Sequence, residues 1–440
     1  MFLRVNDIIA CRALFFIMAF YVGLWTIRIP TIKDQIQTDY LGIGYIFATF
    51  AIGSIIAMFF ASKMIRNTSC RIILIYSGLF QGLLWLPTAF IKNLEIFMII
   101  AFIFGLCFGA FEIALNLYAS NLEKREKKSM MAGFHAFWSL GVLFGSVATS
   151  LFLEWKISFL NNILVYVIIL LPINLLFVFN LIEDQKSSES DKKNIFFIWP
   201  IIIFLLAIIA MANALTEGSV DAWGALYMRD YIKVDGFQIG LATISFNIFM
   251  VLGRLSGDWF RDKLGVYKLL IILFCLTILS LIILIFFNSI VLSILGFAIL
   301  GIGTSSRIPI AYSLAGKIKG IEGGVGITIV SIAVYGTFMG APSLLGLLAN
   351  AYGVNNIFIP MLIIFIFLYC LCQPGIASEK TIIRLGVLAF GTVNWELAAM
   401  QQAQAMETDK YRLQVMKMAN PQAGKIALQS GTVDMIVADW

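Results

Sequence analysis

The stretch Ile96–Leu117, IFMIIAFIFGLCFGAFEIALNL, would be apolar around a whole helix except at Glu112 and Asn116. It is long enough to cross a bilayer core about 30 Å thick, which takes roughly 20 helical residues. Helices that are apolar on all sides belong in a membrane, so we predict an all-α polytopic protein with twelve transmembrane helices. Further stretches of this kind between Ala10 and Cys372 are Ala13–Ile27, Ile72–Phe90, Ile163–Leu181, Ile195–Met211 and Leu269–Phe287.

Charge is scarce and is divided between alternate loops. The chain is 60% hydrophobic and 13% charged, whereas soluble domains are about a quarter charged. Sixteen Lys and Arg residues lie in one set of loops and six in the intervening set. Because a basic excess marks cytoplasmic loops, we place both ends of the helical body in the cytoplasm. The net charge of +6 does not indicate nucleic-acid binding, because the basic residues are not pooled on one surface. We expect no nucleic acid as partner, and we expect the basic loop NLEKREKKS to contact anionic membrane lipids.

A polar segment divides the hydrophobic body into two halves. Residues 183–194, EDQKSSESDKKN, have the composition of a solvated linker. We therefore expect an N-terminal six-helix half over 1–182 and a C-terminal six-helix half over 195–376. A shift of 195 residues superposes Gly23 on Gly218, Glu112 on Arg307, and the glycine pair Gly141 and Gly145 on Gly336 and Gly340. These matches suggest an internal repeat in which the glycine pairs pack helices closely.

Two ionisable residues lie deep in predicted spans, where charge is costly and usually functional. Glu112 is in the fourth span with Asn116 one turn further, and Arg307 is in the tenth. One interpretation is a charge pair across a cavity, broken when substrate or a proton binds. The alternative is a structural pair, or an arginine that reaches the membrane interface.

A second polar layer is predicted toward the outer surface. Arg28 ends the first span, and Asn213, Glu217 and Asp221 follow one another at intervals of four in the seventh. If the helix continues, the two acids share a face and Arg28 would close an outer gate with them. If it ends at Gly218, both acids lie in water.

His135 is the single histidine of the chain. It falls within GFHAFWSLG at the inner end of the predicted fifth span. A packed, hydrogen-bonded histidine and a proton carrier both remain open.

Several motifs resemble the major facilitator superfamily. The second copy of that family's loop signature is GRLSGDWFRDKLG, whose motif residues are Gly253, Arg254, Gly257, Asp258, Arg261, Asp262, Lys263 and Gly265; the first copy, 61–71, lacks its acid and glycine. Closer local matches, to a bacterial subgroup, are LWTIRIPTIKD, FGAFEIALN, GFHAFWSLG, TEGSVDAWGALYMRD and YGTFMGAPSLLGLLA. The resemblance covers Ala10 to Leu371 and implies a cavity between the two halves with alternating access to each side.

The last part of the chain has a different composition. From about residue 377, Ile and Phe give way to Ala, Gln, Met and Val. Residues 377–440 predict the order β-α-β-α-β and resemble the opening of a periplasmic solute-binding protein of the nitrate/taurine type. We interpret them as a truncated fusion or gene-joining artefact; a genuine regulatory module is the alternative.

Two classes of function follow. The first is a secondary transporter that moves a small solute together with protons. The second is a non-transporting sensor or receptor, with the tail as its interaction module. We expect no enzyme activity, cofactor or metal, because no nucleophile–base pair, metal-ligand spacing or phosphate-binding loop is present. We expect a monomer.

Overall fold

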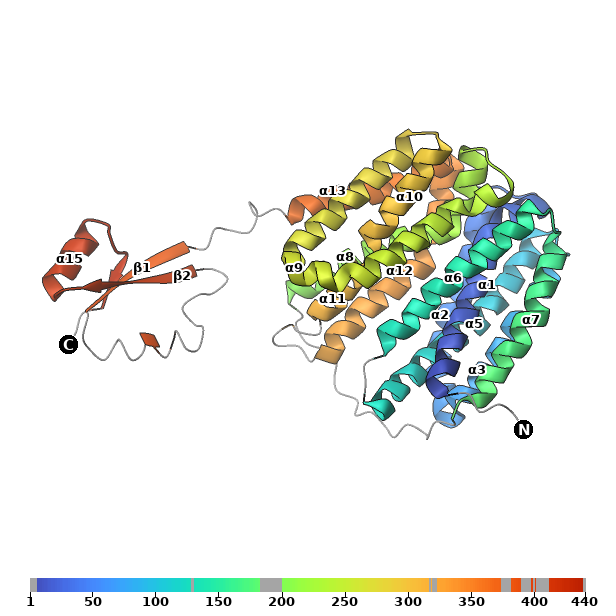
Figure 1. Cartoon of the computed structure of the whole chain (residues 1–440), viewed down its shortest axis with the longest axis horizontal. Helices are drawn as coiled ribbons and strands as arrows, with labels where there is room; N and C mark the ends of the chain where they lie inside the picture. Colours follow the sequence, from blue (N-terminus) through green and yellow to red (C-terminus); the bar gives the residue numbers. More distant parts are fainter. Residues whose placement is uncertain are drawn as a thin grey trace. The chain divides into compact units, whose positions relative to one another are not determined.

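Figure 1 shows the computed structural model of the chain, which describes residues 6–127, 130–182, 200–315, 318, 323–372, 381–388, 397–398, 400 and 411–437. The chain divides into two compact units, Met1–Tyr369 and Cys370–Trp440. The described residues include twelve helical segments long and apolar enough to cross a membrane. The predicted all-α polytopic fold is therefore confirmed.

The N-terminal half consists of the first six spans. Its helices are α1 (Asp7–Gln35), α2 (Tyr40–Asn67), α3 (Cys70–Leu83) with the short α4 (Trp85–Thr88), α5 (Leu94–Glu126), α6 (Met131–Glu154) and α7 (Phe159–Asn180). Polar side chains set where several of them begin. Asp39 accepts from Gly42 N at 2.8 Å and Asn93 from Ile96 N at 3.1 Å. Such caps satisfy backbone N–H groups that have no partner within the helix.

The C-terminal half consists of the remaining six spans. Its elements are α8 (Ile201–Leu226) with η1 (Tyr227–Tyr231), η2 (Gly236–Gly240), α9 (Leu241–Phe286), α10 (Ile290–Thr304), α11 (Arg307–Ala315), α12 (Gly323–Tyr352), η3 (Val354–Phe358) and α13 (Ile359–Leu371). The tenth span is broken between α10 and α11. Pro309 explains the break, because it has no N–H to donate to the carbonyl of Ser305.

The loop signature predicted between the eighth and ninth spans lies within α9. The helix is interrupted at Gly265, whose φ of 75° and ψ of 161° favour glycine. The preceding residues of the motif are helical. Gly253 and Gly257 face Ser305 and Ser306 so closely that a Cβ atom would overlap each hydroxyl. The two glycines thus allow α9 to pack against the break in the tenth span.

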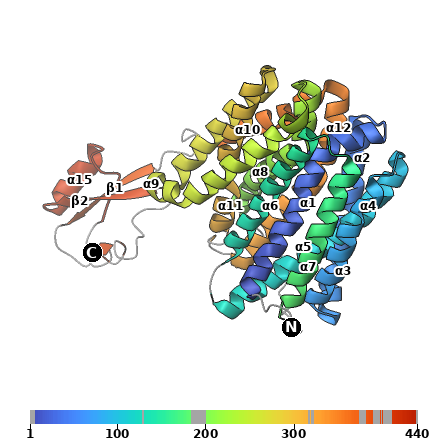
Figure 2. The same ribbon diagram turned by 45° about the vertical axis from the view of Figure 1, so that its right-hand side comes forward.

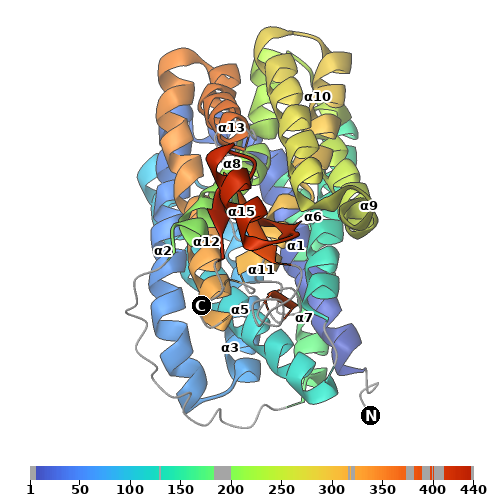
Figure 3. The same cartoon turned by 90° about the vertical axis from the view of Figure 1, so that its left-hand side faces the viewer.

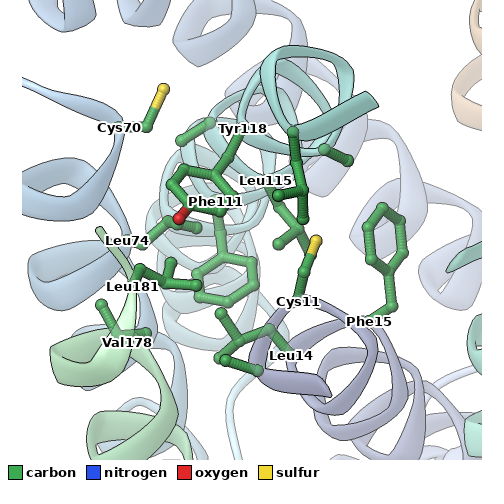
Figure 4. Packing of buried hydrophobic residues seen from close by; sticks show 14 of the residues in the cluster. Cys11, Leu14, Phe15, Cys70, Leu74, Phe111, Leu115, Tyr118, Val178 and Leu181 are labelled. Atoms are coloured by element: carbon green, nitrogen blue, oxygen red, sulfur yellow. The ribbon is translucent and has the colours of Figure 1, made fainter. Parts of the chain in front are cut away.

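Buried apolar side chains hold the N-terminal half together. One cluster joins α1, α3, α5 and the end of α7, and Figure 4 shows Phe111 and Leu115 of α5 among its members. On other faces of these helices, large apolar residues are exposed, as with Ile168 at 68% and Ile99 at 59%. An exposed apolar surface of this kind is expected where lipid, not water, surrounds the protein.

The two halves contact each other through a few helices. In the N-terminal half, α1 lies between α6 and α7 (Figure 2). Between the halves, α12 packs against α2 (Figure 3), α1 against α8, and α6 against α9 and η2. We call the end of the body where α1 begins the proximal end, and the end where α1 finishes the distal end.

Small residues bring the halves together toward the distal end. Gly44 of α2 faces Gly346 of α12, and a Cβ on Gly346 would lie 2.7 Å from the Cα of Gly44. Gly240 of η2 faces Ser150 of α6, leaving no room for a Cβ. Phe47 of α2 also packs against Trp223 of α8, with ring centroids 5.9 Å apart. These contacts place the two backbones side by side near the distal loops.

The two glycine pairs of the predicted repeat differ in how closely a neighbouring helix packs against them. A Cβ on Gly141 or Gly145 would overlap the backbone of α1, at Phe16 and Phe20. A Cβ on Gly336 or Gly340 would meet no atom of the described residues within 4 Å. Close helix packing therefore occurs at the first pair, and the expected equivalent contact at the second is not formed.

The second unit contains a small parallel sheet. Its strands are β1 (Thr381–Leu388), β2 (Tyr411–Met418) and β3 (Met435–Ile436), in the order β2-β1-β3, and α15 (Pro421–Gln429) precedes β3. Arg384 pairs with Asp434 at 3.1 Å. Strands β1 and β2 match those predicted over 382–390 and 411–419, and α15 matches the helix predicted over 420–431. Of the strand predicted over 433–440, the described residues form a strand at Met435–Ile436 alone, and the helix predicted over 394–406 lies largely outside the described part.

Candidate functional site

An ion pair lies inside the helical body. Glu217 is near the middle of the span Ile201–Tyr231, and Arg254 is in α9. Arg254 Nη2 lies 3.2 Å from Glu217 Oε1. Arg254 Nη1 also donates to Ser139 Oγ of α6 at 2.7 Å. Because α6 belongs to the N-terminal half and α8 and α9 to the C-terminal half, the guanidinium joins the halves within the membrane.

The seventh span continues past Gly218, which resolves the alternative left open by the sequence. Helix α8 runs to Leu226, so both acids are helical and neither lies in a distal loop. Asn213, Glu217 and Asp221 therefore follow one face. The prediction that this set lies near the outer surface is wrong for Glu217, which is at mid-span.

Two side chains on this face of α8 have unused hydrogen-bonding atoms. Asn213 is fully buried, and within the described part of the chain neither its amide oxygen nor its nitrogen has a partner. Asp221 Oδ1 is likewise buried and unpartnered, while its carboxylate interacts electrostatically with Glu217 and Arg254. Buried polar atoms without partners cost about 1–3 kcal/mol each. A ligand that supplied partners would remove that cost.

Glu112 of α5 is linked electrostatically to these residues through two tyrosines. It interacts electrostatically with Tyr335 of α12, Tyr335 with Tyr312 of α11, and Tyr312 with Glu217. Asn116 does not add a free amide, because its Nδ2 donates to the Glu112 carbonyl at 2.9 Å. We call the residues linked by these hydrogen bonds and electrostatic interactions, together with Asn213 from the same face of α8, the central polar cluster: Glu112, His135, Ser139, Asn213, Glu217, Asp221, Arg254, Tyr312 and Tyr335.

His135 belongs to the edge of the central polar cluster. Its ring packs edge-on against Phe15 with centroids 5.4 Å apart, and it interacts electrostatically with Arg254. Throughout the described ranges, no group of three or more His, Cys, Asp or Glu side chains could hold a metal ion.

Arg307 does not form the expected pair with Glu112. Its Nη2 donates to Thr277 Oγ1 at 3.0 Å, and its guanidinium lies 5.6 Å from the ring centroid of Phe274 and 4.3 Å from that of Phe365. Nε and Nη1 have no partner in the described structure. The physical reason is direction: Arg307 points at α9 and α13 inside the C-terminal half, away from the N-terminal half.

The outer gate expected from Arg28 is also not formed. Arg28 Nε donates to Asn162 Oδ1 at 3.0 Å and Nη2 to the carbonyl of Ile157 at 2.9 Å. The guanidinium also lies 5.8 Å from the ring centroid of Phe159. Arg28 therefore fastens α1 to the beginning of α7 within the N-terminal half, and contacts neither Glu217 nor Asp221.

A different set of charges connects the halves at the distal end. Arg229 of η1 pairs with Asp34 of α1 at 2.6 Å and with Asp230 at 2.6 Å. Asp230 in turn accepts from Tyr40 Oη of α2 at 2.9 Å and lies 3.5 Å from Lys33 Nζ. We call these five residues the distal charge network. Sequence reasoning missed it, although the signal was present in opposite charges closing both LWTIRIPTIKD and TEGSVDAWGALYMRD.

The sequence matches a known family along most of its length. The model of the Major Facilitator Superfamily matches residues 11–217 and 202–377. The chain belongs to the Major Facilitator Superfamily. It is 26% identical over 356 residues to an MFS-type transporter of Yersinia pestis, covering 80% of this chain and 92% of the relative. It is 26% identical to the membrane protein MosC of Rhizobium meliloti, covering 81% of this chain and 87% of MosC.

Solved structures share the fold at low sequence identity. The nucleoside transporter NupG superposes with a TM-score of 0.68 at 12% identity, covering 85% of this chain and all of NupG. A bacterial homolog of the human lysosomal transporter Spinster gives 0.62 at 11% identity, covering 83% and 95%. Family and fold together are those of an integral membrane transporter, a non-enzymatic class of protein.

Proposed function

We propose that this chain is a secondary active transporter that moves a small solute by alternating access and is coupled to protons. The observation that carries the proposal is the central polar cluster, in which Arg254 bonds Glu217 on its own half and Ser139 on the other. Acidic groups in a transmembrane bundle commonly mark substrate and proton pathways. Rearrangement of the halves would break the Arg254–Ser139 bond and free the guanidinium to respond to a change in charge at Glu217 or Asp221.

The two ends of the body support an access cycle. Close glycine contacts and the distal charge network join the halves at the distal end. We infer that this conformation is closed at the distal end and that opening there requires those contacts to separate. The sequence bias of basic residues supports a cytoplasmic proximal end in a bacterial inner membrane.

Several further assignments belong to the same proposal. We propose halves over 1–182 and 195–376 joined by a cytoplasmic linker over 183–194. The protein would act as a monomer among membrane lipids. In the access cycle, the loop-signature residues would guide movement of the proximal end, because Gly265 interrupts α9 there.

Uptake or efflux by proteoliposomes tests the proposal. The purified full chain is reconstituted and a panel of solutes is offered with and without a pH gradient. We expect flux of at least one solute that rises with the gradient and is lost in Glu217→Gln. Solute flux that does not depend on the pH gradient would refute proton coupling. Absence of flux for every solute in the panel would refute transport.

One observation favours the second candidate function. The described tail forms a sheet within a compact unit of its own, as an interaction module would. A sensor built on a transporter fold predicts ligand binding without flux and a response that is lost when the tail is removed.

A further inference from the structure

The charge of the central polar cluster is unbalanced. It holds three carboxylates, on Glu112, Glu217 and Asp221, and one guanidinium, on Arg254, which is paired with Glu217. Among the described residues, no basic side chain forms an ion pair with Glu112 or Asp221. With all three carboxyl groups ionised, the cluster would have a net negative charge inside the membrane, where an uncompensated charge is costly.

Other basic residues near the cluster do not supply the balance. Arg12 of α1 lies 5.5 Å from the ring centroid of Phe137, and it is not an electrostatic partner of Glu112 or Asp221. Arg307 points into the C-terminal half, toward Phe365. A positive charge that offsets the cluster would have to come from a ligand or from bound protons.

The surroundings of Glu112 suit an organic cation. Phe108 lies one turn before Glu112 on α5, and its ring meets Trp138 of α6 edge-on with centroids 6.3 Å apart. Tyr335 of α12 interacts electrostatically with Glu112. Aromatic faces attract ammonium groups through their π-electrons, so carboxylate and rings together form a site for a charged amine.

The amide of Asn213 adds a second kind of recognition. It is fully buried on the same face of α8 as Asp221, with both polar atoms unpartnered in the described structure. An amide offers one acceptor and two donors, which suits a hydroxyl or carbonyl group better than a second charge. This unpartnered side chain indicates that the acidic face is built for a ligand.

We propose that the transported solute is a small organic cation: a protonated amine that also carries a neutral polar group. The ammonium binds between Glu112 and Asp221 against the rings of Trp138 and Tyr335, and the neutral polar group bonds to Asn213. This inference rests on the proposed transport function. A cation and protons compete for the same carboxylates, so arrival of the ammonium releases a proton from a protonated carboxyl group, and the transport is an exchange.

Binding by matched solutes tests the inference. The probes are two triplets of cation, neutral molecule and anion: glucosamine, glucose and gluconate, then tyramine, tyrosol and 4-hydroxyphenylacetate. Each is added to the purified full chain, and the shift in Tm and the Kd are measured. We expect at least one amine to raise Tm, with a Kd at least tenfold lower than those of its neutral and anionic counterparts.

Variants locate the site. Asp221→Asn and Glu112→Gln should each weaken binding of the amine at least tenfold. Glu112→Asp keeps the negative charge and should retain binding, which would show that the loss in Glu112→Gln is not due to misfolding. Glu95→Gln is the matched control, because it removes an exposed carboxylate from the same helix. Equal loss in Glu95→Gln would overturn the assignment.

Flux of the same probes separates this inference from the proposed function. Amine binding with no flux would uphold the cation site and refute transport. Flux of a neutral or anionic member without amine binding would uphold transport and overturn the substrate class. Failure of both amines to shift Tm would also overturn it.

Discussion

At the scale of single residues, Arg307 shows that a charged side chain inside the membrane need not form an ion pair. Two aromatic rings and one hydroxyl surround its guanidinium, and two nitrogens have no partner in the described structure. Contacts with aromatic rings contribute about 2 kcal/mol when desolvated, which does not offset the loss of water around a buried charge.

We therefore predict that Arg307→Met is tolerated. Replacing buried ionic groups by apolar residues of similar volume is often neutral or stabilising by about 1–4 kcal/mol. The Tm of the purified variant should equal or exceed that of the parent. Arg28→Met is the matched control, because Arg28 bonds both Asn162 and Ile157. It should lower the free energy of unfolding by about 1–3 kcal/mol, and an equal loss in Arg307→Met would show that the contacts of Arg307 with Thr277, Phe274 and Phe365 stabilise the fold.

The sequence indicated which residues are unusual but not where they point. Glu112 and Arg307 were found because ionisable groups stand out in apolar spans. The side chains of Glu112 and Arg307 point in different directions because of how each helix is rotated about its own axis. A short apolar sequence does not specify that rotation. Glu217 and Arg254 were both singled out, yet their pairing required knowledge that α9 stays helical through the loop signature.

At the scale of elements, the glycine pairs offer a matched comparison. Gly145→Ala should push α6 away from α1, because a Cβ overlaps the backbone at Phe20. Overpacking of this kind costs about 1–3 kcal/mol. Gly340→Ala, at the equivalent position of the other half, meets no atom within 4 Å. It should be neutral or stabilise its helix by up to about 1 kcal/mol.

Unfolding temperatures and expression yields of the two variants check this prediction. A similar loss of stability in both would mean that Gly340 is packed in another conformation of the protein. Gly336→Ala and Gly141→Ala form a second pair with the same expectation.

Hydropathy predicted the existence and order of the spans because each must bury about 20 apolar residues in lipid. It did not predict their ends. Helix α8 continues to Leu226 past Gly218 because tertiary packing of the helix overrides the weak helix propensity of a single glycine. The break between α10 and α11 could have been predicted from Pro309, since a proline within a span removes a backbone hydrogen bond.

At the scale of the whole molecule, the distal charge network should bias the protein toward distal closure. Arg229→Gln removes the ion pairs to Asp34 and Asp230, and the population open at the distal end should rise. A cysteine at position 47 on a cysteine-free background reports this, because Phe47 is 7% exposed and contacts Trp223 between the halves. Its labelling rate by an impermeant reagent should increase severalfold in Arg229→Gln.

Lys156→Gln provides the control for the distal charge network, since Lys156 is exposed on another distal loop. It removes one positive charge without breaking a contact between the halves. Unchanged labelling in Arg229→Gln, or an equal increase in Lys156→Gln, would contradict a latch at these residues.

The tail tests whether the helical body is self-sufficient. Transmembrane helices satisfy their backbone hydrogen bonds internally, and α13 ends at Leu371, before the strands of the tail begin. A stop codon after Ser378 should therefore leave membrane insertion, Tm of the body and solute flux unchanged. A stop codon after Phe358 is the contrasting variant. It removes α13, whose Phe365 covers Arg307 and whose Met361 and Leu368 are buried, and it should abolish stable expression. Flux lost on truncation after Ser378, in a body that still inserts and unfolds at the parental Tm, would make the tail a working module and favour the sensor.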